Sequence, residues 1–262
     1  MYEFTLLRPG SIDEAVAALA DEDAQALGGG QTLIPTMKQR LAAPETLVSL
    51  TNIPELYGVC RDGDRLVIGG ATPHAVVARE AAEDFPGLAA LAGQIGDPAV
   101  RNRGTIGGSL ANNDPSACYP AAVLGTGATI QTNAREIAAD AFFDGMFGTA
   151  LDDGEIITGV AFPIAEKAAY VKFPQPASRF AMVGAFVAKY SDGVRVAITG
   201  ASEEGVFRWT EAEATLDRDF SEDAIKELRL TPDGMIGDIH AAPDYRAHLV
   251  GVMTRRAVVA AL

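Results

Sequence analysis

The first part of the chain mixes apolar spacing typical of helices with short apolar runs typical of strands. Ser11 and Glu14 have the spacing of a helix capping box, and apolar residues follow at intervals of three and four. This pattern predicts a helix whose apolar face carries Ile12, Ala15, Val16 and Leu19. The run at 24–27 predicts a short buried strand that enters a glycine-rich segment. Pro35 then begins a predicted helical segment that continues through Gln39.

Strand-like and helical patterns continue to alternate up to about residue 163. Strands are predicted at 46–50, 65–69, 128–132 and 155–162, and helices at 72–78 and 88–95. Between these elements, Pro115 and Pro120 are expected to keep the chain irregular. The alternation of the two kinds of element indicates either α+β or α/β layering.

From about Ala168 the pattern changes to longer apolar runs. Strands are predicted at 170–173, 185–190 and 194–199, with Asp192-Gly193 as a hairpin turn between the last two. Helical patterns follow at 211–216, 221–228 and 245–262. We therefore expect a separate C-terminal α+β domain with an antiparallel sheet, joined to the first part through residues 164–167.

Composition narrows the class of protein. The chain has 262 residues and a formal net charge of −14, which argues against nucleic acid or an anionic membrane as its main partner. Its two cysteines, Cys60 and Cys118, are too few for a disulfide scaffold and have no spacing suited to zinc or an iron–sulfur cluster. With no secretory signal pattern and no run of about 18 apolar residues, a cytoplasmic protein is expected.

Two glycine-rich segments carry the most specific chemistry. The first runs from Gly28 to Pro35 and the second from Asn102 to Pro115. Glycines let successive backbone N–H groups approach an anion closely, so two such loops are suited to clamp a diphosphate. Side chains that can donate further hydrogen bonds without net charge are Gln31, Thr32, Thr105, Ser109 and Asn112. On composition alone, a pair of ordinary tight turns remains an alternative interpretation.

Charged residues near these loops allow two interpretations. Arg101 and Arg103 precede the second loop's glycines, and Lys38 and Arg40 follow the first loop. They are either phosphate ligands or solvated surface charges.

Other reaction classes find little support. The Gly-Lys-Ser/Thr ending of a P-loop is absent from both segments, which argues against hydrolysis of nucleoside triphosphates. The three histidines, His74, His240 and His248, are scattered and lie outside both loops. Ser109 and Ser116 lack the surroundings of a nucleophile elbow. No catalytic residue and no metal ligand is therefore predicted in this chain.

The two loops together resemble the FAD-binding subunits of molybdenum hydroxylases, such as the medium subunit of aerobic carbon monoxide dehydrogenases and the flavin domain of xanthine dehydrogenases. The family's pattern of a small residue, two glycines, His or Gln, Ser or Thr, Leu and Pro is matched at 28–35, and its longer second pattern is matched from Ile95 to Pro115. Similar features recur at 172–173, 176–178, 245–249 and 255–257, so the resemblance extends over essentially the whole chain.

The resemblance implies a fold and a set of cofactor contacts. The implied fold is α+β: a two-part FAD-binding domain of the PCMH type, like that of vanillyl-alcohol oxidase, at 1–163 with a division near residue 55, and a smaller domain at 168–262. The FAD diphosphate would lie between the two loops, Ile95 against the cofactor, and Lys172 near the flavin ring. The implied FAD-binding residues are Gly28, Gly29, Gly30, Gln31, Thr32, Leu33, Ile95, Thr105, Ile106, Gly107, Gly108, Ser109, Asn112, Cys118 and Lys172.

One position departs from the family pattern. Where many relatives have an acidic residue, this chain has Cys118, followed by Tyr119 and Pro120. A carboxylate contact to the sugar chain of the cofactor would be lost there, because a thiol is a weak hydrogen-bond partner. No histidine lies in either motif, and we therefore expect FAD to be bound noncovalently.

The resemblance also implies partners. A large subunit would hold the molybdenum cofactor and oxidise the substrate, and a small subunit would carry two 2Fe-2S clusters. Electrons would pass from those clusters through FAD to a quinone, NAD or oxygen, and the resemblance implies a dimer of heterotrimers. Two alternatives stay open: a self-contained flavin reductase or oxidase, and a nonenzymatic binding or assembly module. The sequence of this chain does not identify the substrate of the whole enzyme.

Overall fold

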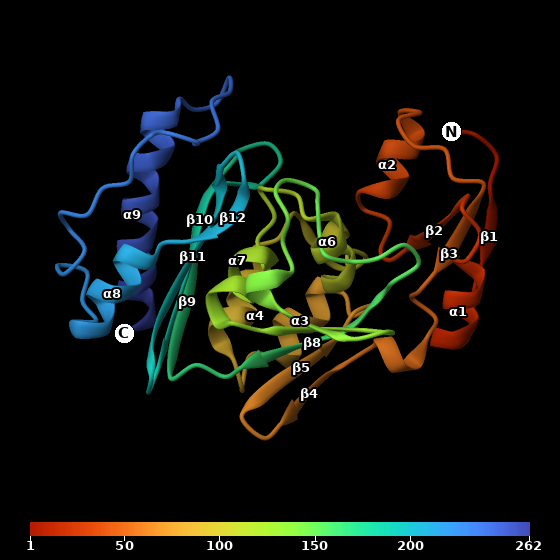
Figure 1. The fold of residues 1–262 in the computed structure, drawn as a ribbon, viewed down its shortest axis with the longest axis horizontal. Helices are drawn as coiled ribbons and strands as arrows, with labels where there is room; N and C mark the ends of the chain where they lie inside the picture. Colours follow the sequence, from red (N-terminus) through yellow and green to blue (C-terminus); the bar gives the residue numbers. More distant parts are fainter.

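Three β-sheets organise the chain in the computed structural model, which describes residues 1–262 (Figure 1). The N-terminal sheet has the order β1-β3-β2 and is parallel, with strands β1 (Thr5–Leu7), β2 (Ala24–Leu27) and β3 (Thr46–Ser49). Helix α1 (Ile12–Ala18) begins at Ser11, whose hydroxyl accepts a 3.2 Å hydrogen bond from the Glu14 N–H, so the predicted capping residue is confirmed. Helix α2 (Leu33–Lys38) follows the first glycine loop.

The central sheet has five strands in the order β4-β5-β8-β6-β7, and all of its pairings are antiparallel. Its strands are β4 (Val59–Asp62), β5 (Arg65–Gly69), β6 (Thr129–Thr132), β7 (Glu136–Ala138) and β8 (Ile157–Pro163). The associated helices are α3 (His74–Glu80), α4 (Pro86–Gly93), α5 (Pro98–Arg101), α6 (Ile106–Asn112) and α7 (Tyr119–Thr126), with 3-10 turns η1 (Pro54–Leu56) and η2 (Ala139–Ala141).

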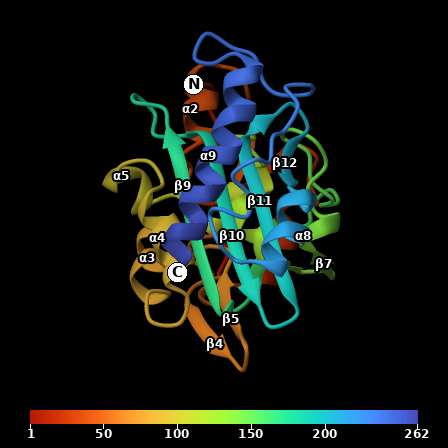
Figure 2. The same ribbon diagram turned by 90° about the vertical axis from the view of Figure 1, so that its left-hand side faces the viewer.

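The C-terminal sheet is antiparallel, as expected, and is covered on both faces (Figure 2). Its order is β12-β11-β10-β9, with strands β9 (Lys167–Pro174), β10 (Ala181–Tyr190), β11 (Gly193–Ser202) and β12 (Gly205–Arg208). In β10, Ala185 and Val187 face the core under helices α8 (Thr210–Arg218) and α9 (Pro243–Ala261), whereas Phe186 and Ala188 face the core that includes α4 and α7. Burial on both faces explains why this strand is apolar throughout.

The structure corrects the sequence prediction in two segments, one at the start of α7 and one at residues 221–228. Pro115 lies in the turn segment between α6 and α7, as expected, but Pro120 does not keep the chain irregular, because it occupies the first turn of α7, where a missing N–H costs no helical hydrogen bond. Residues 221–228 form turns rather than a helix. Their backbone bonds, such as Leu228 N–H to Ile225 O, span three residues, and Ile225 is the one fully buried side chain.

The hairpin between β10 and β11 also differs by one position from the prediction. Tyr190 pairs with Gly193, so the two turn residues are Ser191 and Asp192. No helix of the structure has the length and apolar character needed to cross a membrane.

Candidate cofactor site

A single large pocket of about 560 Å³ lies where the three sheets meet. Its wall includes the end of β2, both glycine loops, the start of β8 and Lys172 on β9. Pockets for small molecules and cofactors usually fall within about 300–1,000 Å³, so this one has the size of a cofactor site. All of the sequence-predicted FAD residues line it except Ile106, whose side chain is fully buried in the central core.

The first glycine loop presents a run of free backbone donors to this pocket. The N–H groups of Gly28, Gly29, Gly30, Gln31 and Thr32 make no hydrogen bond within the protein, and all five residues line the pocket. The loop joins β2 to α2, which reproduces the strand, loop and helix order expected from the sequence. Unpaired backbone donors at a pocket wall are a ready site for anionic oxygens.

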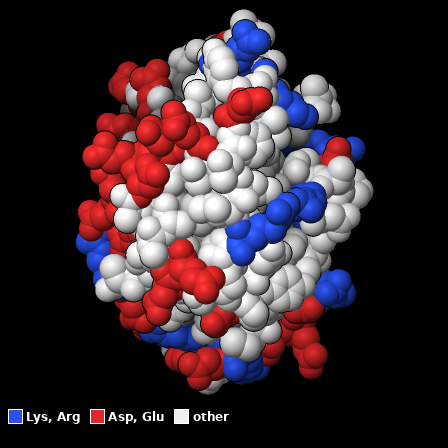
Figure 3. All heavy atoms as spheres, turned by 90° about the vertical axis from the view of Figure 1, so that its right-hand side faces the viewer, with Lys and Arg blue, Asp and Glu red and all other residues white.

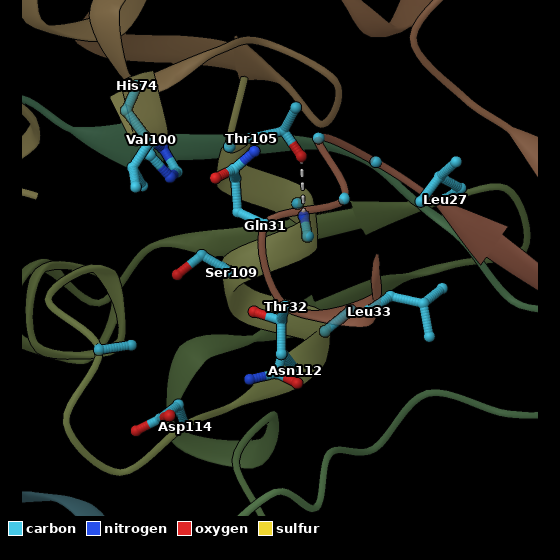
Figure 4. Close-up of a pocket in the computed structure, with 18 of the residues that line it drawn as sticks. Leu27, Gln31, Thr32, Leu33, His74, Val100, Thr105, Ser109, Asn112 and Asp114 are labelled. Atoms are coloured by element: carbon cyan, nitrogen blue, oxygen red, sulfur yellow. Dashed lines mark hydrogen bonds between the residues drawn. The ribbon is translucent and has the colours of Figure 1, made fainter. Parts of the chain in front are cut away.

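The second glycine loop is built differently, because most of its N–H groups already have partners, although that of Thr105 does not. Thr105 caps α6, and its Oγ1 accepts from the Gly108 N–H at 3.2 Å (Figure 4). The Ile106 N–H donates to Thr72 O, and the Gly107 N–H donates to Gly70 O. The Ser109 N–H donates to Thr105 O. The sequence analysis expected two equal main-chain cradles. In the structure, the second loop can offer mainly the side chains of Ser109 and Asn112 (Figure 4).

The two loops touch each other through their glycines. A Cβ on Gly28 would lie 2.7 Å from Thr105 Oγ1, and a Cβ on Gly29 would overlap Arg103 O. Only glycine therefore permits this approach. The contact joins the two sequence motifs into one wall, beside which a diphosphate can receive hydrogen bonds from the free donors of the first loop. The residues present thus fit a dinucleotide cofactor.

Lys172 marks one end of the pocket. Its Nζ donates to Gln94 O at 2.9 Å and to Arg179 O at 2.7 Å, and it lies 3.4 Å from Cys118 Sγ. Half-buried Ile95 lines the same end. The structure therefore brings together Ile95, Cys118 and Lys172, which are far apart in the sequence. These three are the residues that the resemblance associates with the flavin ring or the adjoining sugar chain.

The pocket is poor in cations. Lys172 and Arg179 are its only basic lining residues, and none of Lys38, Arg40, Arg101 and Arg103 lines it. Arg101 instead donates to Ile95 O and Gly96 O. The N-terminal face of the molecule carries many acidic side chains along its left side, with basic ones in a short central band and scattered near the edges (Figure 3). Neutral donors of the first loop must therefore provide much of any phosphate binding.

Sequence reasoning missed His74, which lines the pocket although it lies outside both motifs. Its backbone N–H donates to Gly104 O at 2.9 Å, and the centroid of its ring lies 5.3 Å from the centroid of the Tyr119 ring. Burial, with a smaller contribution from the Arg101 charge, lowers the pKa of His74 to about 4, so the imidazole is neutral near pH 7. Nothing in its local sequence signalled this position, because it depends on the contact between α3 and the second loop.

A second pocket residue missed from the sequence is Asp114, and Gly70, Val100, Arg179 and Phe180 also line the site. Asp114 belongs to the second motif, and its place within Asn112–Pro115 was a usable signal that went unused. The remaining lining residues come from segments whose proximity is set by the pairing of the sheets.

The fold and the pocket define a protein that binds a nucleotide-type cofactor through a glycine-loop wall. Residues 2–165 match the family described as FAD binding domain in molybdopterin dehydrogenase. The chain is 34% identical to the carbon monoxide dehydrogenase medium chain of Afipia carboxidovorans, over 97% of this chain and 95% of that protein. It is 32% identical to the nicotine 6-hydroxylase medium subunit of Paenarthrobacter nicotinovorans, with the same coverage.

Solved structures agree with these matches. The structure of carbon monoxide dehydrogenase from Oligotropha carboxidovorans superposes with a TM-score of 0.89 at 30% identity, covering 100% of this chain and 99% of that one. Quinoline 2-oxidoreductase from Pseudomonas putida 86 gives a TM-score of 0.88 at 29% identity, covering 99% and 97%. The chain therefore belongs to the family of FAD-binding medium subunits of the molybdenum hydroxylases, and FAD is its cofactor.

Proposed function

We propose that this chain holds FAD noncovalently and relays electrons between a partner subunit and an external acceptor. The first glycine loop binds the diphosphate, and the end near Lys172 receives the flavin ring. Bound FAD supplies chemistry in which electrons are taken up and released singly or in pairs. The chain's own residues orient the cofactor and limit the access of solvent to it.

One observation carries this proposal above the others. The five consecutive residues from Gly28 to Thr32 have free N–H groups and line a pocket of about 560 Å³ that Lys172 also lines. No His, Ser or Cys arrangement suited to substrate activation accompanies them, which favours a role in electron transfer rather than in substrate oxidation. The predicted ligands of the diphosphate remain Gly28 to Thr32 and Thr105 to Ser109, with Leu33 and Asn112 among the other predicted FAD-binding residues.

The partners follow from the relatives. The similar proteins are named as medium chains or subunits of enzymes such as carbon monoxide dehydrogenase and nicotine 6-hydroxylase. We infer that this chain joins a large molybdenum-cofactor subunit and a small 2Fe-2S subunit, as a dimer of heterotrimers, and receives electrons from the 2Fe-2S clusters. A cytoplasmic location stays a prediction from the sequence, as do the domain boundaries at 163 and 168.

The test begins with the isolated chain. We expect added FAD to bind, with its fluorescence changed, and to be released completely on denaturation. Flavin that stayed on the unfolded polypeptide would contradict noncovalent binding. Failure to bind FAD at all would contradict the proposed cofactor role and favour an assembly module.

The second step uses the chain co-expressed with the molybdenum and 2Fe-2S subunits proposed for its complex. Oxidation of substrate by the large subunit should reduce FAD in the complex but not in the isolated chain. Sustained turnover by the isolated flavoprotein with its own substrate would instead favour a self-contained reductase or oxidase.

A further inference from the structure

Two carboxylate residues line the cofactor pocket, and they differ in how many of their oxygens are occupied. Glu155 accepts hydrogen bonds at both oxygens, from Thr132 Oγ1, from the Arg135 guanidinium and from the Asp152 N–H. Arg135 is the main reason that the pKa of Glu155 is lowered to about 2. This carboxylate is therefore committed to holding the pocket wall together.

Asp114 has one oxygen to spare. Its Oδ1 accepts from the Ser116 N–H at 2.8 Å, and its Oδ2 has no partner within the protein. The residue is partly buried beside Asn112, and burial raises the pKa of its carboxyl group. In the close-up, Asp114 lies on the loop that follows the helix carrying Ser109 and Asn112 (Figure 4). Asp114 is thus an acceptor in the pocket wall that lacks a donor.

The backbone holding Asp114 is fixed by the C-terminal sheet. The Gly200 N–H donates to Pro115 O at 2.7 Å, and the Thr199 hydroxyl lies 2.7 Å from Ala117 O. The Ala181 N–H donates to Ser116 O at 3.3 Å. Strands β10 and β11 therefore place the carboxylate at a defined position on the segment that leads to Cys118.

The ligand supplies the missing donors. The ribityl chain of FAD carries hydroxyl groups, which need acceptors when they leave water. Cys118 offers only a weak sulfur acceptor, which already lies against Lys172 Nζ. The wall near this end of the pocket thus lacks a carboxylate at 118 and has an unused one at 114.

We propose that Asp114 Oδ2 accepts a hydrogen bond from a ribityl hydroxyl of FAD, a role for which the thiol of Cys118 is poorly suited. This inference rests on the proposed binding of FAD. It makes Asp114 a determinant of affinity for the flavin half of the cofactor, whereas the first glycine loop determines affinity for the diphosphate.

The test compares Asp114→Asn with a matched control. Asparagine keeps an oxygen for the Ser116 N–H but places an NH₂ donor where the free acceptor was. A hydrogen bond to a charged group contributes about 1.5–3 kcal/mol, so FAD affinity should fall by about tenfold or more. Asp97→Asn is the control, because Asp97 also accepts a backbone N–H, that of Val100 at 2.9 Å, but does not line the pocket.

Binding of FMN and ADP, which are fragments of FAD, shows which half of the cofactor Asp114 contacts. Affinities for FAD, FMN and ADP are measured by titration with wild type, Asp114→Asn and Asp97→Asn. We expect Asp114→Asn to weaken FAD and FMN by a similar factor and to leave ADP unchanged, with Asp97→Asn unchanged throughout. Equal weakening of ADP, or wild-type FAD affinity in Asp114→Asn, would overturn the proposal. Wild-type protein that bound no FAD would instead contradict the proposed function.

Two further variants keep the result interpretable if Asp114→Asn folds poorly. Asp114→Ser retains a short acceptor for the Ser116 N–H and should show the same selective loss of FMN. In the Asp114→Asn, Cys118→Asp double variant, a carboxylate returns to the same segment, and FAD affinity should recover to within about threefold of wild type. No recovery in a folded double variant, together with an unaffected Asp114→Ser, would refute the assignment.

Discussion

The two glycine loops have similar compositions but opposite hydrogen-bonding states. The first loop has five free N–H groups and half-buried glycines, whereas in the second loop the backbone from Gly104 to Gly107 is buried and all of its N–H groups except that of Thr105 donate to neighbouring carbonyls. One loop is a binding surface, and the other supports it. A glycine-rich motif can therefore serve a cofactor either by contacting it or by allowing close approach of the backbone that does so.

The largest effect is expected at the contact between the loops. A Cβ at Gly29 would overlap the carbonyl oxygen of Arg103, a backbone atom that cannot move away cheaply. Gly29→Ala should abolish measurable FAD binding and lower the free energy of unfolding by about 3 kcal/mol. Gly93→Ala is the matched control, since its Cβ would meet only Ala78 Cβ at 4.0 Å. FAD titration and urea unfolding of both variants check this, and normal binding by Gly29→Ala would break the comparison.

Lowering the pH should destabilise the protein through His74, which packs against the second loop. The folded-state pKa of His74 is lowered to about 4 from 6.5, so the unfolded chain takes up a proton first as the pH falls. The free energy of unfolding is therefore unaffected by His74 above pH 6.5 and decreases as the pH falls toward 4. At pH 5 the decrease is about 2 kcal/mol. Urea unfolding across this range should show a shallower pH dependence for His74→Gln, and no change for exposed His240→Gln. Equal slopes for wild type and His74→Gln would exclude a neutral buried imidazole.

A smaller effect tests whether Gly28 and Thr105 act as a pair. Thr105→Ala removes the N-cap of α6 and should cost about 1 kcal/mol. Gly28→Ala places a Cβ 2.7 Å from the Thr105 hydroxyl and should cost about 1–2 kcal/mol. The alanine at 105 removes that hydroxyl and with it the overlap. The double variant should therefore lose about 0.5–1 kcal/mol less unfolding free energy than the two single variants lose together. Simple additivity in denaturant unfolding would show that the two loops are independent.

The smallest change in affinity is expected at the opposite end of the pocket. Lys172→Met removes the hydrogen bonds to Gln94 O and Arg179 O and the positive charge near Cys118. We expect FAD affinity to fall only a few fold, by less than about 1.4 kcal/mol, with a shifted absorption spectrum of the bound flavin. Lys189→Met is the control, because Lys189 lies over the Phe220 ring. An unchanged spectrum in Lys172→Met would place the flavin ring elsewhere.

Much of the fold could be predicted because its signals are local. The capping residue Ser11, strand β2 and strand β5 follow directly from their own side chains, and all were found at the predicted positions. Helices α6 and α7 were missed, since their glycines and prolines oppose helix formation locally. They form because Leu110, Tyr119 and Val123 are buried in the central core.

The site was predictable as a set of residues but not as a set of bonds. Through the family resemblance, the motifs identified a part of the pocket wall that includes distant Lys172, and all but one of the predicted residues line the pocket. They could not show that the second loop's N–H groups donate to Gly70 and Thr72, because those carbonyls belong to the segment between β5 and α3. His74 was missed for the same reason.

The central claim is that the diphosphate binds to the free N–H groups of the first loop. The most direct measurement is backbone amide hydrogen exchange of the protein with and without saturating FAD. The account predicts strong new protection in the segment from Gly28 to Leu33, and little change from Ile106 to Leu110, whose amides already have acceptors. New protection confined to the second loop, with exchange at Gly28 to Leu33 unchanged, would contradict it.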